Sequence, residues 1–477
     1  MADEPLLETT LAEDAAQSDR LDPSVWKIAA VALMGGLLAQ LDATIVNVSL
    51  SNLATDLDTG LSTIQWVTSG YLLALTLVLP LNGWLVGRIG AKALYLWCFA
   101  GFTLSSALCA FAWSANSLIA FRVLQGISGG LLAPMAQMMI ARAAGKHMAR
   151  VAGYTVLPVL LAPVLGPVIA GAILQYASWR WLFLVNLPVG ALAWLLAVLF
   201  LPGEREEMTP RKLDWLGLAL LSPGLALFLY GSDKFGEAAG RVLLVAGVVM
   251  MAAFLWTARR KGDEALVDLR LFRGKVFSTS AITQFLSNGV QFAGQMLIPA
   301  FLIDACDREP SEMGWMLAPL GLGMMVTYPL MGALTDRFGI RAVSAGGALL
   351  TFIATTPFLH LAIHGLDLFV LIPALFVRGM AMSAVGLPSM TAAYTSVRKQ
   401  DLPMATTSLN IVQRLGGPTM TTLSAALLAW RLDLPATGSA DSTAYAWAFL
   451  FLCSLHALTF LSAIRLPRRL DDVAIET

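Results

Sequence analysis

The stretch Gly83-Trp-Leu-Val-Gly-Arg-Ile-Gly90 closes one long apolar block of the sequence, and Gly332-Ala-Leu-Thr-Asp-Arg-Phe-Gly339 closes another much later in the chain. Both follow the pattern G-x-x-x-x-R-x-G, and both fall in loops of only a few residues. One such match arises easily by chance. A second echo, Arg122-x-x-Gln-Gly126 against Arg378-Gly379, lies at an equivalent place. Together the repeats predict a chain built from two related halves.

Apolar residues dominate the chain between these motifs. Of the 477 residues 57% are hydrophobic and only 13% are charged, whereas soluble domains carry about 25% charged residues. Apolar blocks of about 18 residues or more with few charges are expected to cross a membrane as helices. The sequence therefore predicts an all-α polytopic membrane protein with fourteen spans, at 26–50, 62–87, 93–113, 117–141, 151–176, 181–201, 213–231, 241–258, 277–303, 312–334, 342–363, 367–394, 404–430 and 444–464.

The repeats divide these spans into two six-helix bundles, 26–201 and 277–464, because parallel halves related across the membrane normal are one architecture of transporters. Two extra spans, 213–258, are inserted between them. The stretch 259–276 is rich in Lys and Arg and is predicted to be a cytoplasmic linker or a surface helix. An acidic, polar tail at 1–25 is predicted to be disordered, and 465–477 forms a second tail.

The distribution of basic residues predicts the orientation. Most of the 31 Lys and Arg residues fall in the loops on the side of the two termini, and cytoplasmic loops carry such an excess. Both termini are therefore expected in the cytoplasm of a multi-pass protein of the cell membrane, in bacteria the inner membrane. Most of the 13 Trp residues lie near span ends, as an interfacial belt requires.

Several classes of protein are excluded by what the sequence lacks. The net charge is zero, so the basic surface of a nucleic-acid-binding protein is missing. The four cysteines are scattered, without the Cys and His spacing of a metal site. No Walker A, nucleophile elbow or H-E-x-x-H motif occurs, and no His or carboxylate cluster lies at one membrane face. We expect neither an enzyme nor a metal or other cofactor.

Asp42 is the only carboxylate well inside a predicted span, and Arg122 lies at a similar depth. An ionised group at bilayer depth is expensive, so it usually faces a cavity, forms a pair or carries protons. An Asp with an Arg partner that moves between two conformations can bind and release a proton. Two structural readings stay open: Asp42 bonded permanently to Thr44 or Asn47, and Arg122 bonded to carbonyl groups without taking part in transport.

Two further arginines, Arg378 and Arg414, lie near mid-membrane with no carboxylate in a span beside them. They could simply bond nearby glutamines or carbonyls. They could also create a positive cavity that favours an anionic or neutral solute, which argues against assuming a cationic substrate. The candidate substrate-cavity residues are Gln125, Gln284, Gln291, Gln295, Arg378 and Arg414.

The segment Gly166-Pro-Val-Ile-Ala-Gly171 follows Pro158 and Pro163 and concentrates helix breakers in mid-membrane. Proline kinks a helix, and glycine lets helices approach closely. This pattern fits either a bend that seals the two halves or packing alone.

These motifs resemble those of the major facilitator superfamily, and within it the fourteen-helix drug:proton antiporter family of the multidrug efflux type. Leu41-Asp-Ala-Thr-Ile-Val-Asn-Val-Ser-Leu50 resembles the first-helix signature of that family. Arg122-Val-Leu-Gln-Gly126 is similar to its basic motif, the Gly166–Gly171 segment to its antiporter motif, and Ser178–Gly190 to its segment entering the sixth helix. The resemblance implies proton coupling by Asp42 and Arg122. It also implies conformational motifs at Gly83, Arg88, Gly90, Gly166, Pro167, Gly171, Gly332, Asp336, Arg337 and Gly339.

The sequence departs from the family pattern at several positions. In the first loop motif the position of the Asp is Gly87, whereas the second copy keeps Asp336. In the antiporter motif two glycine positions are Ala162 and Ala170. In the family the loop Asp is thought to help latch one conformation, and the first half lacks this Asp.

The leading prediction is a secondary active exporter that exchanges an inward proton for an outward hydrophobic or amphipathic compound by alternating access. Export of an endogenous metabolite or an anionic solute is the alternative. A channel would need a filter segment or rings of like residues, which are missing. The expected partners are a small-molecule substrate, protons and membrane lipid, without nucleic acid. The sequence gives no sign for or against a periplasmic adaptor protein.

Overall fold

The computed structural model describes residues 22–203, 211–309, 312–432 and 440–469. Within these ranges every regular element is a helix, as the sequence predicts. Nearly all of the predicted tail at 1–25 and the last residues of the tail at 465–477 lie outside the described residues.

The first half of the chain forms a bundle of helices that begin and end close to the predicted bounds. Ser114 starts one of them, α8, because its side chain accepts the N–H of Ser117 in a capping box. The elements are α2 (Pro23–Val48), α3 (Leu50–Asp56), α4 (Leu61–Ile64), α5 (Trp66–Val78), η1 (Leu79–Leu81), α6 (Asn82–Ile89), α7 (Ala91–Ala110), α8 (Ala115–Gly129), α9 (Leu132–Ala144), η2 (Gly145–His147), α10 (Met148–Tyr176), α11 (Trp181–Leu184) and α12 (Asn186–Phe200).

The second half repeats this order after an inserted helix pair. The pair comprises α13 (Trp215–Asp233) and α14 (Ala238–Lys261), followed by the short turns η3 (Gly262–Glu264) and η4 (Leu269–Arg273) where a linker is predicted. The second bundle comprises α15 (Lys275–Ala300), η5 (Phe301–Ala305), α16 (Met313–Thr327), η7 (Tyr328–Leu330), α17 (Met331–Phe338), α18 (Ile340–His364), α19 (Leu368–Thr395), η8 (Lys399–Asp401), α20 (Leu402–Leu432) and α21 (Ala440–Ala463).

The two G-x-x-x-x-R-x-G motifs fold alike. Gly90 and Gly339 each have a φ of 83°, a conformation that L side chains disfavour. Each glycine ends one helix, α6 or α17, and turns the chain directly into the next, α7 or α18. The equal geometry supports the internal repeat.

Length and hydropathy single out twelve candidate membrane spans among the described residues. One of them, Ala115–Tyr176, is 62 residues long and runs through α8, α9 and α10. At 1.5 Å per residue it would measure about 93 Å, three times the hydrocarbon core. The 31-residue helix α20 is not among the candidates, because Arg414 and several Thr and Ser residues lower its hydropathy. The predicted number of fourteen spans stays a prediction.

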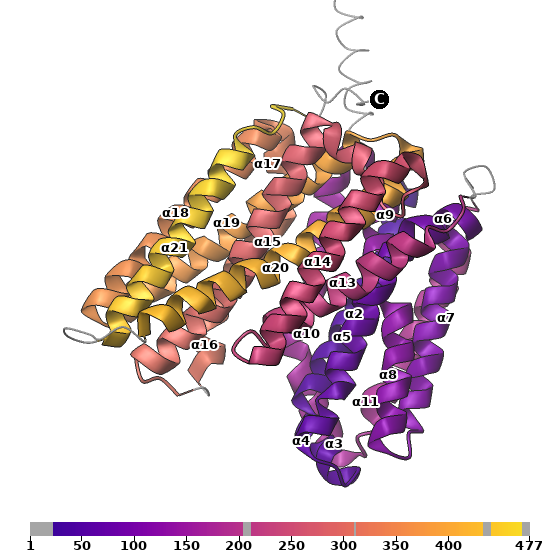
Figure 1. Cartoon of the computed structure of the whole chain (residues 1–477), viewed down its shortest axis with the longest axis horizontal. Coiled ribbons are helices and arrows are strands. Elements are labelled where there is room, and N and C mark those ends of the chain that lie inside the picture. Colours follow the sequence, from indigo (N-terminus) through magenta and orange to yellow (C-terminus); the bar gives the residue numbers. More distant parts are fainter. Residues whose placement is uncertain (1–21, 204–210, 310–311, 433–439, 470–477) are drawn as a thin grey trace, which may run out of the picture.

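The two halves lie side by side and meet at one end (Figure 1). We call this the motif end, because α6 and α17 lie there. Here α6 and α9 pack on α20, and α10 packs on α17. Met138 and Val151 of the first half share one apolar cluster with Met331 and Leu402 of the second. Toward the opposite end each half has a separate core, and the helices diverge.

Candidate functional site

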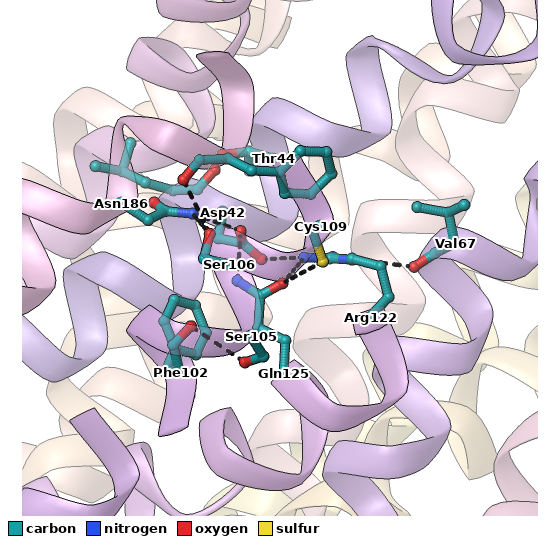
Figure 2. A network of polar contacts seen from close by, with 12 residues as sticks. Asp42, Thr44, Val67, Phe102, Ser105, Ser106, Cys109, Arg122, Gln125 and Asn186 are labelled. Atoms are coloured by element: carbon teal, nitrogen blue, oxygen red, sulfur yellow. Dashed lines mark hydrogen bonds and ion pairs between the residues drawn. The ribbon is translucent and has the colours of Figure 1, made fainter. Parts of the chain in front are cut away.

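The Asp42 carboxylate lies toward the C-terminal end of α2, fully buried in the first half (Figure 2). Its Oδ2 atom is 2.5 Å from Nη1 of Arg122 on α8. Its Oδ1 atom accepts hydrogen bonds from Nε2 of Gln125 at 3.0 Å and from Nδ2 of Asn186 at 2.7 Å. Side chains of two other helices, α8 and α12, thus donate hydrogen bonds to this buried charge, as a membrane interior requires.

Arg122 is equally buried and its guanidinium is held on several sides. Nε donates to the carbonyl of Val67 at 3.2 Å, and Nη1 also donates to Oε1 of Gln125 at 2.7 Å. Its guanidinium carbon lies 4.2 Å from the centroid of the Tyr71 ring, a cation–π distance. Arg122 and Gln125 lie three residues apart on α8, so they face the same neighbours.

A second layer of polar groups orients Asn186. Its Nδ2 also donates to Oγ of Ser106 on α7 at 3.1 Å, and that hydroxyl donates to the carbonyl of Phe183 at 2.9 Å. The Thr44 hydroxyl, an alternative partner for Asp42 in the sequence, instead donates to the carbonyls of Gln40 and Leu41. The network joins α2, α5, α7, α8 and α12, so a change of charge at Asp42 reaches most of this bundle.

The second half holds a matching site around Arg378 of α19. Its Nη1 donates to Oγ1 of Thr355 at 2.5 Å and lies 3.1 Å from Nε2 of His456. Thr355 follows Gly339 by the same number of residues as Ser106 follows Gly90. His456 lies on α21, the last helix of its half, as Asn186 lies on α12. The two buried arginines therefore occupy equivalent positions.

The matching site lacks the carboxylate. A Cβ added to Gly294, on the first helix of the second half, would collide with Nη2 of Arg378. That Nη2 has no hydrogen-bond acceptor among the described residues. The charge of Arg122 is paired with Asp42, whereas Arg378 has no carboxylate partner in the part of the chain that the structure describes.

Comparison with known proteins decides the family. The sequence profile described as Major Facilitator Superfamily matches residues 32–306 and 280–474. The chain belongs to this superfamily. It is therefore a transporter and not an enzyme.

Similar major facilitator proteins carry names from drug resistance. The chain is 33% identical over 423 residues to the multidrug resistance protein B homolog of Mycobacterium tuberculosis, covering 87% of this chain and 78% of that protein. It is 30% identical over 467 residues to the putative multidrug resistance protein MdtD of Klebsiella pneumoniae, covering 95% and 96%.

Two solved structures share the fold. The human organic anion transporter MFSD10 aligns with a TM-score of 0.64 at 19% identity, over 93% of this chain and 100% of that chain. A bacterial homologue of the iron transporter ferroportin, in an outward-facing state, aligns with a TM-score of 0.64 at 11% identity, over 92% and 98%. At these identities the structures establish the major facilitator fold alone.

The other candidate residues of this major facilitator protein are spread over several places. Gln284 is buried and donates to Oγ of Ser389 at 3.0 Å, and its Oε1 accepts from Gln413 at 2.9 Å. Gln291 is half-buried and Gln295 is exposed. The idea that nearby glutamines bond the arginines does not hold for Arg378, which bonds Thr355 and His456 instead.

The conformational motif residues differ in what surrounds them. Gly83 lies against Pro403 and Met404 of α20, and Gly332 lies against Arg150, so both face the other half. Gly166 lies against Thr44, whereas nothing lies near a Cβ built on Gly171. Four side chains of this set are exposed: Arg88, Pro167, Asp336 and Arg337.

Sequence reasoning missed several members of the buried networks, among them Asn186, Ser106 and His456. Asn186 interrupts the apolar run 181–193 inside a quoted motif, and that isolated polar residue was a usable signal. Ser106 and His456 gave none on their own, because their importance comes from helices that are distant in sequence. The equal spacing of Ser106 and Thr355 from the repeated glycines could have pointed to the pair.

Proposed function

We propose that the protein is a proton-coupled antiporter that exports hydrophobic or amphipathic compounds, a member of the fourteen-helix drug:proton antiporter family. The buried contact between Asp42 and Arg122 carries this proposal. The names of the relatives from Mycobacterium and Klebsiella support export of drugs. Export of an anionic metabolite is a second candidate function, because the second half carries positively charged side chains, including Arg414, inside its spans.

Protonation of Asp42 supplies the coupling step. A proton added to a carboxylate oxygen removes the negative charge and turns an acceptor of hydrogen bonds into a donor. Arg122 keeps its charge, so a buried guanidinium loses its counterion and the arrangement becomes costly. Movement of α2 against α8 relieves that cost, and release of the proton on the other side of the membrane restores the pair.

The same proposal sets the topology and the conformation. We place the motif end in the cytoplasm, because Arg88, Arg142, Arg150 and Arg337 gather at the helix ends there. Fourteen spans follow when Ala115–Tyr176 crosses twice and α20 crosses once. The apolar cluster shared by the halves at the motif end then closes the cytoplasmic side, which corresponds to an outward-facing state. A reporter fused at Gly236, between α13 and α14, should read external, and a cytoplasmic reading would refute this topology.

The function is tested by flux in proteoliposomes with an imposed pH gradient and a panel of hydrophobic and amphipathic compounds. Wild-type protein should move at least one compound against its gradient only when the pH gradient is present. Asp42→Asn should abolish this coupled flux, because the side chain keeps its shape and loses its titratable proton. Asp233→Asn, an exposed carboxylate at the end of α13, is the control and should transport normally. Coupled flux that persists in Asp42→Asn would remove Asp42 from the mechanism.

A further inference from the structure

Three arginines lie far from the ends of the described spanning helices, and their surroundings differ. Arg122 is paired with Asp42. Arg378 is 1% exposed and is enclosed by Thr355, His456 and Gly294 inside the second bundle. Arg414 is partly exposed, and among the described residues its guanidinium has neither an ion pair nor a hydrogen bond. Of these three arginines, Arg414 is thus the one whose guanidinium has no hydrogen-bonding or ionic partner among the described residues.

The row of residues on α20 that contains Arg414 faces the first half. Pro403 lies beside Gly83, Thr407 accepts a hydrogen bond from Asn82 at 3.2 Å, and Asn410 donates to Gln137 at 2.8 Å. Arg414 follows Asn410 by one helical turn on the same face. Arg414 therefore points at the first half.

Arg414 lies where the contact between the halves ends. The side chains of α20 from Leu402 to Ile411 are mostly buried, and those from Val412 to Leu415 are partly exposed. Beyond this point α20 runs away from the first half (Figure 1). The guanidinium therefore sits at the edge of the buried contact between the halves, on the face of α20 that is turned to the first half.

We infer that the compounds exported by this protein are amphipathic organic anions whose carboxylate or similar group is bound by Arg414. The inference rests on the proposed function and names its substrate class. A guanidinium binds a carboxylate with two parallel hydrogen bonds, and it stays charged in both states of the cycle. Without such a ligand, the partly buried charge of Arg414 has no counterion among the described residues. The apolar part of the compound lies along the adjoining helices.

Binding of three matched probes tests the inference: pyrenebutyrate, pyrenebutanol and pyrenebutyltrimethylammonium share one apolar body and differ in charge. Equilibrium binding is measured on the purified full chain in detergent, with empty micelles as the blank. The anion should bind about tenfold more tightly than the alcohol, and the cation should bind most weakly. Arg414→Gln should remove the preference without changing binding of the alcohol, and Arg414→Lys should keep most of it.

Arg431→Gln is the matched control, because Arg431 lies on the same helix but stacks on Trp430 and Trp447 near its far end. It should leave all three affinities unchanged. Equal affinities, tighter binding of the cation, or no binding of the anion would each overturn the inference. If Arg414→Gln does not fold, the ranking of the three probes on wild-type protein decides. Proton-coupled flux is measured separately, so a drug exporter that prefers cations would refute only this inference.

Discussion

Three donors converge on the carboxylate of Asp42, and only one of them is charged. Gln125 and Asn186 can bond a carboxyl group whether or not it carries a proton, whereas the attraction of Arg122 depends on the negative charge. In the proposed proton-coupling cycle, the amides therefore keep the Asp42 side chain in position while the ion pair forms and breaks. Arg122 is the partner whose contribution changes with protonation.

A double-mutant cycle should show that the contribution of Arg122 depends on the charge of Asp42. Arg122→Ala leaves Asp42 buried and unpaired, and we expect a loss of about 3–5 kcal/mol in the free energy of unfolding. In the double variant with Asp42→Asn the loss should be much smaller, because no charge remains to be stranded. Arg122→Lys should fold better than Arg122→Ala without full activity, because Lys lacks the planar fork. The measurement is unfolding in detergent at neutral pH, and strictly additive effects would contradict a direct interaction.

The pairing of Asp42 with Arg122 was partly predictable from the sequence. Counting residues from the span ends gave both side chains a similar depth, because the helical rise is constant. The count says nothing about which helices adjoin or which faces meet. Asn186 and Tyr71 complete the site only through the packing of α12 and α5, and the link between Arg378 and His456 joins two helices whose contact no local pattern encodes.

At the level of helices, two prolines interrupt spans that the apolar pattern of the sequence predicts to be continuous. The predicted spans 62–87 and 312–334 are not single helices, because Pro80 and Pro329 each introduce a short 3-10 turn just before the G-x-x-x-x-R-x-G motif. A proline lacks the N–H that the α-helical ladder needs. Apolar length therefore predicted where the helical segments lie, and the equivalent breaks in both halves required the structure.

Glycines fix how closely helices approach, and their surroundings predict which of them matter. A Cβ on Gly126 of α8 would lie 2.5 Å from the carbonyl oxygen of Tyr71, so Gly126→Ala should destabilise the protein by about 1–3 kcal/mol. Gly171→Ala should be neutral or gain up to about 1 kcal/mol, because that position is open and alanine favours helix. Melting in detergent compares the two. Equal effects would show that close packing at Gly126 is unimportant.

The inserted pair has its own anchor at the motif end. Asp214 caps α13 by accepting the N–H of Gly217 at 2.9 Å and pairs with Lys261 at the end of α14. Burial alone would raise the pKa of Asp214, but the bonds from Lys261 and Gly217 outweigh it and hold the pKa below its usual range. Because the folded value is lowered, this contribution is full above the ordinary Asp pKa of about 4 and disappears as the pH falls through the folded value.

Asp214→Asn keeps a capping side chain but removes the negative charge, so it should cost about 1 kcal/mol at pH 7, and the difference from wild type should shrink below about pH 4. Thermal unfolding at several pH values measures it. Asp401→Asn is the control, because its partner Arg398 is on the surface and such pairs contribute little. A cost of Asp214→Asn that stays constant down to the lowest pH would contradict the charge-based explanation.

On the scale of the whole molecule, polar and apolar contacts together close the motif end. Gln137 accepts hydrogen bonds from Asn410 at 2.8 Å and from Tyr394 at 3.1 Å, and Asn82 donates to Thr407. Each of these bonds crosses from one half to the other. If the halves rock, they have to break in every cycle, because one rigid closure cannot give access to both sides.

Linking Asn82 to Thr407 should therefore stop transport. We expect the pair Asn82→Cys and Thr407→Cys, in a chain whose four native cysteines are replaced by alanine, to lose flux on oxidation and regain it on reduction. The measurement is flux in proteoliposomes. Each single cysteine variant is the control and should be insensitive to oxidant. Normal flux through the cross-linked protein would show that this contact need not open.

If Arg414 binds the exported anion, as inferred above, its charge has a consequence for the source of energy. A proton that enters and an organic anion that leaves both move charge in the same direction across the membrane. A membrane potential, negative inside, then drives both steps, and each elementary charge contributes about 2.3 kcal/mol per 100 mV. In an exporter of this kind the membrane potential would drive two charge movements in each cycle. It would keep working at an external pH where the proton gradient has vanished and only the electrical term remains.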